Sequence, residues 1–220
     1  MNHILYESAR EPTENELIER SCSFYKSMNS RRSLRFFSER DVPKAVIETL
    51  LMTASTAPSG ANKQPWTFCA IRSATLKAQI RVAAEEEEYR NYHGRMSDEW
   101  LQDLATIGTD WQKPFLEIAP WLIVVFRRSY EAETNGHKRQ NYYVQESVGL
   151  ACGFLLTAIQ QAGLVTLTHT PSPMDFLTKI LGRPSNEKPF LLLPVGYPAP
   201  DATVPNISRK SKEEVIVWFD

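Results

Sequence analysis

The sequence lacks several features that would place it in a common class. Lysine and arginine number 25 against 26 aspartates and glutamates, so no overall positive charge is available to gather nucleic acid or anionic lipid. The cysteines, Cys22, Cys69 and Cys152, are odd in number and have no paired spacing, which argues against a disulfide framework or a zinc site. We therefore expect a reducing, cytoplasmic setting, no nucleic-acid partner and only local anion binding.

Targeting and membrane-spanning segments are also missing. The N-terminus, MNHILYESAREPTENE, has no basic start followed by an apolar run, as a secretory signal would. The longest nearly apolar run, Val148–Ile159, is too short to cross a bilayer. There is no HExxH pair and no glycine-rich loop of the Walker or dinucleotide type. We expect a soluble protein with no membrane partner and no metal site.

Apolar spacing predicts a single α+β domain over residues 1–220 with at least four strands. The apolar residues that follow Pro43 recur at helical spacing and predict a helix that ends before Pro58. Further helices are expected over Ala74–Arg95, with or without a flexible end, Val144–Gln161 and Pro173–Leu181. Strands are expected at Trp66–Ile71, Trp121–Phe126, Leu164–Leu167 and Phe190–Gly196. Small residues along the helix over 144–161 would let another element or a partner subunit approach closely.

The last residues form a β-prone arm. VIVWF, Val215–Phe219, follows an irregular, proline-bearing stretch at the end of the chain. A β-prone segment in this position needs a sheet edge to pair with, in its own chain or in a partner subunit.

Two motifs are candidates for binding a phosphorylated heterocycle. RRSLR, Arg31–Arg35, brings three guanidiniums around a hydroxyl, and the planar guanidinium matches phosphate oxygens. APSGANKQPW, Ala57–Trp66, combines small residues whose backbone can approach a ligand with Asn62 and Gln64, which can hydrogen-bond a heterocycle's edge. Taken singly, the first motif could be an exposed basic turn and the second an ordinary helix-to-strand loop.

Together the two motifs resemble the flavin-binding signature of the nitroreductase superfamily. Within it, the sequence is similar to the iodotyrosine deiodinases from about Arg31 to Val217. The matching segments are EEEEYRNYHGRM, TDWQKPFLEIAP, ACGFLLTAIQQAGLVTLTHTP, LGRP and LLPVGYPAPDATVP. The resemblance implies a nitroreductase-like fold, with a mixed central sheet flanked by helices. It also implies an intertwined homodimer that exchanges C-terminal arms (about 200–220), an N-terminal extension (1–30), and FMN at the subunit interface.

The resemblance also implies which residues hold FMN. The phosphate and ribityl chain would be held by Arg31, Arg32, Ser33, Arg35 and Arg209. The isoalloxazine ring would be contacted by Pro58, Ser59 and Gly60 on one flank and by Thr168, His169 and Thr170 on the other. Thr170 is the expected catalytic residue, because its hydroxyl would lie at flavin N5 and favour single-electron steps over hydride transfer. His169 stands where a third threonine is expected, which suggests a contact through its backbone only.

The glutamate run, Glu85–Glu88, contains the expected substrate ligand. In a helix, Glu88 and Tyr92 share a face because they are four residues apart, whereas Glu85–Glu87 point elsewhere and are expected to be solvated. Alone, Glu88 would equally fit a solvated face. The resemblance adds Lys113 and implies a lid over about 84–116 that closes on an amino acid zwitterion. The backbone N–H of Ala61 would hold the substrate's phenolate oxygen.

These implications predict one reaction. FMN-dependent reductive dehalogenation would convert 3-iodo-L-tyrosine, 3,5-diiodo-L-tyrosine, or their bromo and chloro analogues to tyrosine and halide. The electrons would come from a partner reductase or NAD(P)H. The alternatives are a general NAD(P)H-dependent nitro or quinone reductase, which needs an open site, and a non-catalytic flavin-binding protein.

Overall fold

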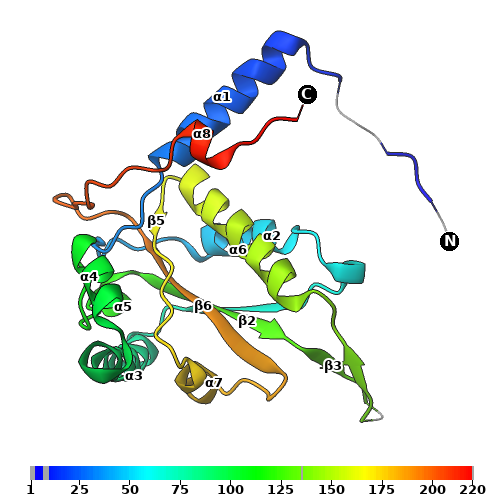
Figure 1. Cartoon of the computed structure of the whole chain (residues 1–220). Helices are drawn as coiled ribbons and strands as arrows, with labels where there is room; N and C mark the ends of the chain where they lie inside the picture. Colours follow the sequence, from blue (N-terminus) through cyan, green and yellow to red (C-terminus); the bar gives the residue numbers. More distant parts are fainter. Residues whose placement is uncertain (1–2, 7–9, 135, 220) are drawn as a thin grey trace.

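A four-stranded sheet forms the centre of the computed structural model, which describes residues 3–6, 10–134 and 136–219 (Figure 1). The strand order is β1 (Trp66–Ile71), β2 (Trp121–Arg128), β6 (Glu187–Gly196), β5 (Val165–Thr166). Each of these ladders is antiparallel. Within the described residues, the mixed pairing expected from the resemblance is limited to one isolated parallel bridge, between Ser33 and Thr166.

The described chain has helices on both faces of this sheet and others that project away from it (Figure 1). The helices are α1 (Glu14–Ser30), α2 (Lys44–Ser55), α3 (Ala74–Arg90), α4 (Asp98–Thr106), α5 (Phe115–Ile118), α6 (Val144–Gln161), α7 (Asp175–Ile180) and α8 (Lys212–Val215). Short helical turns occur at η1 (Gly60–Asn62) and η2 (Asn91–Arg95), and a hairpin of β3 (Tyr130–Ala132) and β4 (Lys138–Gln140) extends from the body.

The central strand β2 separates two hydrophobic cores. Successive side chains of a strand point to opposite faces, so a strand covered on both sides is apolar throughout. Trp121, Ile123 and Val125 pack with residues of α2 and α6 on one face. Leu122, Val124 and Phe126 pack with residues of α3, α5 and α7 on the other. The fold is therefore a three-layer arrangement of helices, sheet and helices.

Most expected elements are confirmed. The strand over Trp66–Ile71 and the helix over Val144–Gln161 have the predicted bounds, and α2 ends before Pro58. Helix α1 was not expected from the sequence, although the segment TENE, residues 13–16, forms a capping box at its start. Thr13 Oγ1 accepts the Glu16 N–H at 3.3 Å, and Glu16 Oε2 accepts the Thr13 N–H at 2.7 Å.

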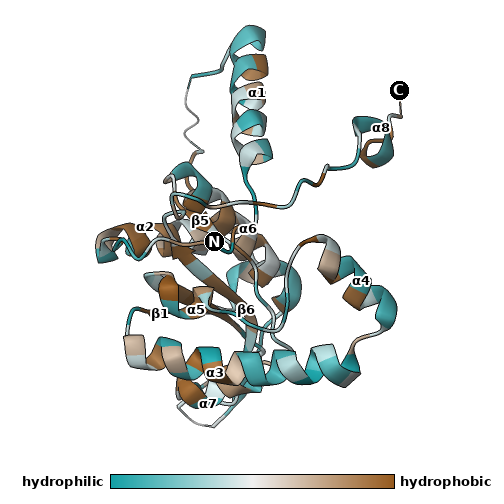
Figure 2. Ribbon diagram, turned by 90° about the vertical axis from the view of Figure 1, so that its left-hand side faces the viewer, coloured by the Kyte–Doolittle hydropathy of each residue, from teal (hydrophilic) through white to brown (hydrophobic). Residues whose placement is uncertain are grey.

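Helix α1 and the C-terminal segment that carries α8 project away from the sheet (Figures 1 and 2). Helix α1 buries none of its residues, and Leu17, Ile18, Phe24 and Tyr25 are exposed. The expected β-prone arm forms no strand in the described chain. Val215 ends α8, and residues 216–219 lie outside helices and strands and are exposed, including Trp218. No helix among the described residues is long and apolar enough to cross a membrane.

Candidate active site

A basic cavity lies where the chain leaves α1. It has a volume of about 250 Å³, and its lining includes Arg31, Arg32, Ser33, Arg35 and Arg209. Arg209 donates to the carbonyls of Asn29 and Arg31, at 3.0 and 2.9 Å, which ties the C-terminal segment to the end of α1. Arg32 donates to the carbonyl of Pro205. Five of the predicted cofactor residues are therefore brought together by segments more than 170 positions apart.

The charge of this cavity is not neutralised by the protein. Burial lowers the pKa of Arg31, and the neighbouring Arg209 and Arg32 lower it further. Among the described residues that line the cavity, none is acidic. The arrangement therefore favours an anionic ligand with several oxygens, such as a phosphate monoester.

A second cavity, of about 300 Å³, adjoins the first because Ser33 and Arg35 line both. Its other lining residues include Glu88, Tyr92 and Lys113. Glu88 and Lys113 are 7% and 3% exposed, and Lys113 Nζ lies 3.8 Å from Glu88 Oε2. The Tyr92 hydroxyl donates to the carbonyl of Thr109 at 3.3 Å. The three predicted substrate residues from α3, η2 and the loop before α5 therefore meet in one place.

The Glu88–Lys113 pair is held apart rather than closely bonded. A separation of 3.8 Å exceeds that of a good hydrogen bond. Lys113 Nζ instead donates to the carbonyl of Asp110 and to Thr109 Oγ1. Burial raises the pKa of Glu88 and lowers the pKa of Lys113, and in each case the partner's charge opposes the shift. Two buried opposite charges in this geometry can each receive a group from a zwitterionic ligand.

The glutamates that precede Glu88 are not all solvated, so that expectation is wrong for two of the three. Glu85 accepts the backbone N–H of Lys113 at 2.6 Å, and Glu87 pairs with Arg95 at 2.8 Å. Glu86 alone is exposed as expected. The prediction considered only the spacing of four, whereas residues three apart also share a helix face, and Glu85 precedes Glu88 by three.

The segment Thr168–Thr170 runs past the second cavity, and all three of its residues line it. His169 exchanges two backbone hydrogen bonds with Leu192 of β6, at 2.9 and 3.0 Å. Its side chain is buried against the edge of the Phe115 ring, whereas Thr168 and Thr170 are exposed. The two threonines are therefore accessible to a ligand in this cavity, while His169 anchors the segment to the sheet.

Burial lowers the pKa of His169 to about 3, with further contributions from Lys113 and Arg35. Among the described residues, no partner contacts its buried Nε2 atom. His169 is therefore a neutral histidine at ordinary pH.

The loop Pro58–Ala61 lies elsewhere in the chain. Within the described residues, none of its four members lines either cavity. The Gly60 N–H donates to Ser147 near the start of α6, whereas the end of α1 meets Gln160 near the end of α6. Helix α6 has 18 residues and is about 27 Å long. Within one chain, the arginines and the Pro58–Ala61 loop, which form the two parts of the predicted flavin site, are therefore separated along α6.

The loop is shaped by its contacts with the segment before α6. A Cβ added to Gly60 would lie 2.9 Å from the carbonyl oxygen of Tyr142, which is closer than real Cβ contacts, so glycine is required there. Ala61 has a φ of 49°, in the left-handed region. These constraints fix the direction in which the Ala61 N–H points.

Comparison with known protein families identifies the family of this chain. The Nitroreductase family model matches residues 28–197, which include Arg31–Arg35 of the basic cavity, Glu88, Tyr92 and Lys113 of the second cavity, and the four strands of the sheet. The chain belongs to the nitroreductase family.

Relatives within this family narrow the assignment. An iodotyrosine deiodinase of Haliscomenobacter hydrossis is 63% identical over 93% of this chain and 92% of its own length. Iodotyrosine deiodinase 1 of Homo sapiens is 45% identical over 99% of this chain and 75% of its own length. The chain therefore falls in the iodotyrosine deiodinase branch of the nitroreductase family.

Solved structures agree with this placement. Oxidized iodotyrosine deiodinase bound to FMN and 3-iodo-L-tyrosine superposes with a TM-score of 0.76 and 33% identity, over 90% of this chain and 98% of that one. A nitroreductase-like protein from Streptococcus mutans, at 20% identity and a TM-score of 0.66, shares the fold.

Two features of this nitroreductase-family site were not predicted. The buried Asn91 donates from Nδ2 to the carbonyl of Ser172 at 2.8 Å, which ties the end of α3 to the loop after Thr170. Trp100 and Leu104 of α4 line the second cavity. Asn91 follows Glu88 by three and so could have been found from helical spacing, but the position of α4 depends on tertiary packing.

Proposed function

We propose that this protein is an FMN-dependent reductive dehalogenase that converts 3-iodo-L-tyrosine and 3,5-diiodo-L-tyrosine, or their bromo and chloro analogues, to tyrosine and halide. The observation that carries the proposal is the buried Glu88–Lys113 pair in a cavity that adjoins the basic one. A nitroaromatic or a quinone has no ammonium and carboxylate pair that would bind two buried opposite charges. An amino acid zwitterion needs both.

The residues of the basic cavity fit the cofactor. A phosphate monoester carries a charge of roughly −1.5 to −2 at neutral pH and binds best to several guanidiniums, which Arg31, Arg32, Arg35 and Arg209 supply. Ser33 adds a hydroxyl donor. Bound FMN supplies the two electrons of the reaction, and the protein supplies orientation and electrostatics.

The clamp residues would orient the substrate. Glu88 would accept from the substrate's ammonium, while Lys113 and the Tyr92 hydroxyl would donate to its carboxylate. Binding the amino acid end in this way would fix the position of the halogenated ring beside Thr168 and Thr170, which line the same cavity. The Thr170 hydroxyl would lie at the flavin, where it would favour single-electron transfer. Trp100 and Leu104 of α4 would exclude water from the closed site.

A second copy of the chain would complete the site. The loop Pro58–Ala61 contacts α6 at Ser147, whereas the end of α1 that precedes the arginines contacts it at Gln160. We therefore assign the loop's flavin contacts, and the Ala61 N–H on the phenolate, to the partner subunit. Exposed apolar side chains on α1 and α6 support a dimer, among them Phe24 of α1 and Phe154 of α6.

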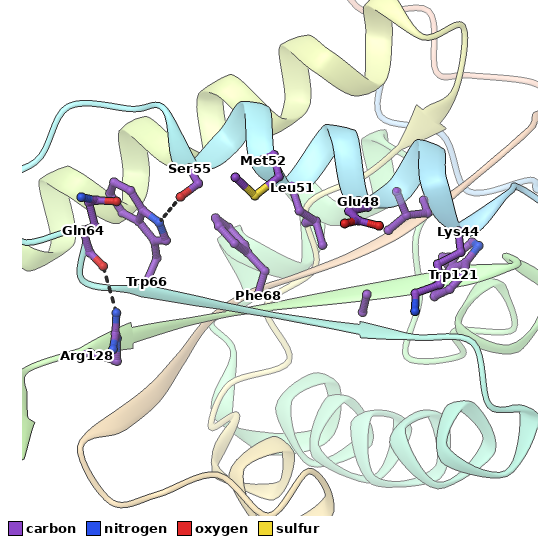
Figure 3. A pocket seen from close by; sticks show the side chains of 12 residues that line it. Lys44, Glu48, Leu51, Met52, Ser55, Gln64, Trp66, Phe68, Trp121 and Arg128 are labelled. Atoms are coloured by element: carbon purple, nitrogen blue, oxygen red, sulfur yellow. Dashed lines mark hydrogen bonds between the residues drawn. The ribbon is translucent and has the colours of Figure 1, made fainter.

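The C-terminal arm would pair with the edge of the sheet in the partner. Strand β1 lies at one edge of the four-stranded sheet, so its outer backbone groups are unpaired within the sheet. Beside it, a groove of about 590 Å³ is lined by Leu51, Met52, Trp66 and Phe68 (Figure 3). The exposed arm over 215–219 has the apolar side chains and β propensity that such a groove accommodates.

The proposed function is tested by purification with FMN, followed by titration. We expect a yellow protein whose flavin fluorescence falls on addition of 3-iodo-L-tyrosine, and release of one iodide per dithionite-reduced flavin. FMN without quenching or iodide release would leave only a flavin-binding protein. Faster NAD(P)H oxidation with a nitroaromatic than iodide release from iodotyrosine would support a general reductase.

The electrons would come from a partner reductase or from NAD(P)H. Omitting dithionite and supplying NADPH or NADH alone separates these two, because only direct use of the nucleotide would then release iodide. All three cysteines are free thiols, which supports the proposed reducing, cytoplasmic setting.

A further inference from the structure

We propose that Glu85 is a positioning residue for substrate recognition, which acts by holding the backbone of Lys113 against α3. This inference rests on the proposed role of Lys113 in binding the substrate's carboxylate.

The geometry around Glu85 points to Lys113 rather than to solvent. Its Oε1 atom accepts the backbone N–H of Lys113 at 2.6 Å and the Nε–H of Arg81 at 2.8 Å. Arg81 also reaches Oε1 of Glu117 at 3.4 Å. The Glu85 carboxylate therefore links α3 to the segment that leads into α5, and Arg81 orients that carboxylate from one turn earlier in the helix.

Two glutamates on one face of α3 interact with Lys113. Glu85 and Glu88 are three residues apart on α3, and one contacts the backbone of Lys113 while the other faces its ammonium. The stretch that carries the lysine, from Thr109 to Pro114, lies outside helices and strands. A hydrogen bond to an ionised carboxylate is among the stronger single anchors available to such a loop.

Loss of this anchor would displace the ammonium. Lys113 Nζ is bonded within its own loop, to Asp110 and Thr109, so it moves with the loop and not with α3. Its separation from Glu88 would then vary. A ligand that uses both charges would lose affinity, whereas one that lacks the zwitterion would not.

An ordinary structural role predicts a different result. The Arg81–Glu85 pair is an i,i+4 ion pair of α3, and such pairs contribute little to the stability of a helix. A Glu85 that only stabilised the helix would therefore affect the binding of all ligands equally and slightly. The ligand dependence therefore distinguishes positioning from general stability.

The experiment compares Glu85→Ala, Glu85→Gln and Glu86→Ala in the FMN-loaded protein. Glu86 lies on the same helix and is exposed, so its variant controls for the lost charge. Dissociation constants are measured by flavin fluorescence for 3-iodo-L-tyrosine and for 2-iodophenol, which lacks the amino acid groups. Limited proteolysis of the Thr109–Pro114 stretch supplies a readout that is independent of the flavin.

We expect Glu85→Ala to weaken iodotyrosine binding about tenfold or more, since one charged hydrogen bond is lost. Binding of 2-iodophenol should change by less than about twofold. Glu85→Gln keeps the acceptor for the Lys113 N–H and should restore most of the affinity. Proteolysis of the loop should accelerate in the alanine variant alone.

The inference would be overturned if Glu85→Ala and Glu86→Ala had the same Kd for 3-iodo-L-tyrosine. It would also be overturned if Glu85→Ala weakened the binding of 3-iodo-L-tyrosine and 2-iodophenol by the same factor. Lys113→Gln separates this failure from failure of the clamp itself. If Lys113→Gln leaves iodotyrosine affinity unchanged, the proposed role of Lys113 is wrong; if it weakens binding and Glu85→Ala does not, only the present inference falls.

Discussion

Replacing Glu88 by glutamine tests the substrate clamp most directly. The side chain keeps its size and hydrogen-bonding ability but loses the charge that faces Lys113 Nζ at 3.8 Å. In the free protein this leaves the buried Lys113 ammonium donating to the neutral oxygens of Thr109 and Asp110 without the facing charge of Glu88. In the complex it removes the carboxylate that would bind the substrate's ammonium.

The magnitude follows from the burial of the pair. Two unit charges about 4 Å apart attract by about 4 kcal/mol at an effective dielectric constant of 20, which is an upper bound because both groups are also desolvated. A hydrogen bond to a charged group contributes about 1.5–3 kcal/mol net. We expect a loss of about 2 kcal/mol in binding 3-iodo-L-tyrosine, which is roughly a thirtyfold higher Kd.

The assay is a fluorescence titration of the FMN-loaded protein, with Glu86→Gln as the matched control. Glu88→Gln should retain full FMN content, since Glu88 does not line the basic cavity. Its Kd for 2-iodophenol should stay within about twofold of the parent value, because that ligand has no ammonium. A Kd for iodotyrosine within twofold of the control would refute the clamp. Loss of FMN together with substrate affinity would instead show that Glu88 acts on the fold or cofactor.

Four further predictions address the other parts of the site. His169→Gln should remove a pH dependence of the free energy of unfolding. The pKa of His169 is about 3 in the folded protein and about 6.5 in the unfolded chain, so the unfolded chain takes up the proton first as the pH falls. The stability present above pH 6.5 therefore falls by about 2 kcal/mol between pH 7.5 and 5.0. Urea unfolding at the two pH values should show a smaller drop in the variant, and equal drops would contradict the shift. Gly60→Ala should cost about 1–3 kcal/mol in unfolding free energy and lower FMN content, because the added Cβ meets the carbonyl oxygen of Tyr142 at 2.9 Å; calorimetry with unchanged stability would argue against so tight a packing. Thr170→Ala should raise the ratio of nitro reduction to iodide release, and an unchanged ratio would remove Thr170 from its proposed role. Deleting residues 216–220 should shift the protein toward monomer in sedimentation, with FMN lost in parallel; a stable FMN-loaded dimer would exclude arm exchange.

Local patterns were sufficient for much of the fold. The strand Trp66–Ile71 and the helix Val144–Gln161 have their predicted bounds, because the length of an apolar segment and the residues that end it are local features of the sequence. The arm shows the limit of such patterns. VIVWF has strong β propensity, but a strand requires a partner edge, and no edge of its own described chain reaches it.

The sequence by itself determined the chemical types at the site: arginines for an anion, a carboxylate with a tyrosine on one helix face, and a distant lysine that only the family resemblance connected to them. The tertiary structure decided which of these meet. Packing of α3 on α5 buries Glu88 beside Lys113 and turns Glu85 from an expected surface residue into a backbone anchor. The length of α6 separates the arginines from the Pro58–Ala61 loop within one chain. Distances between remote segments arise from packing in three dimensions, and for that reason no local spacing in the sequence reports them.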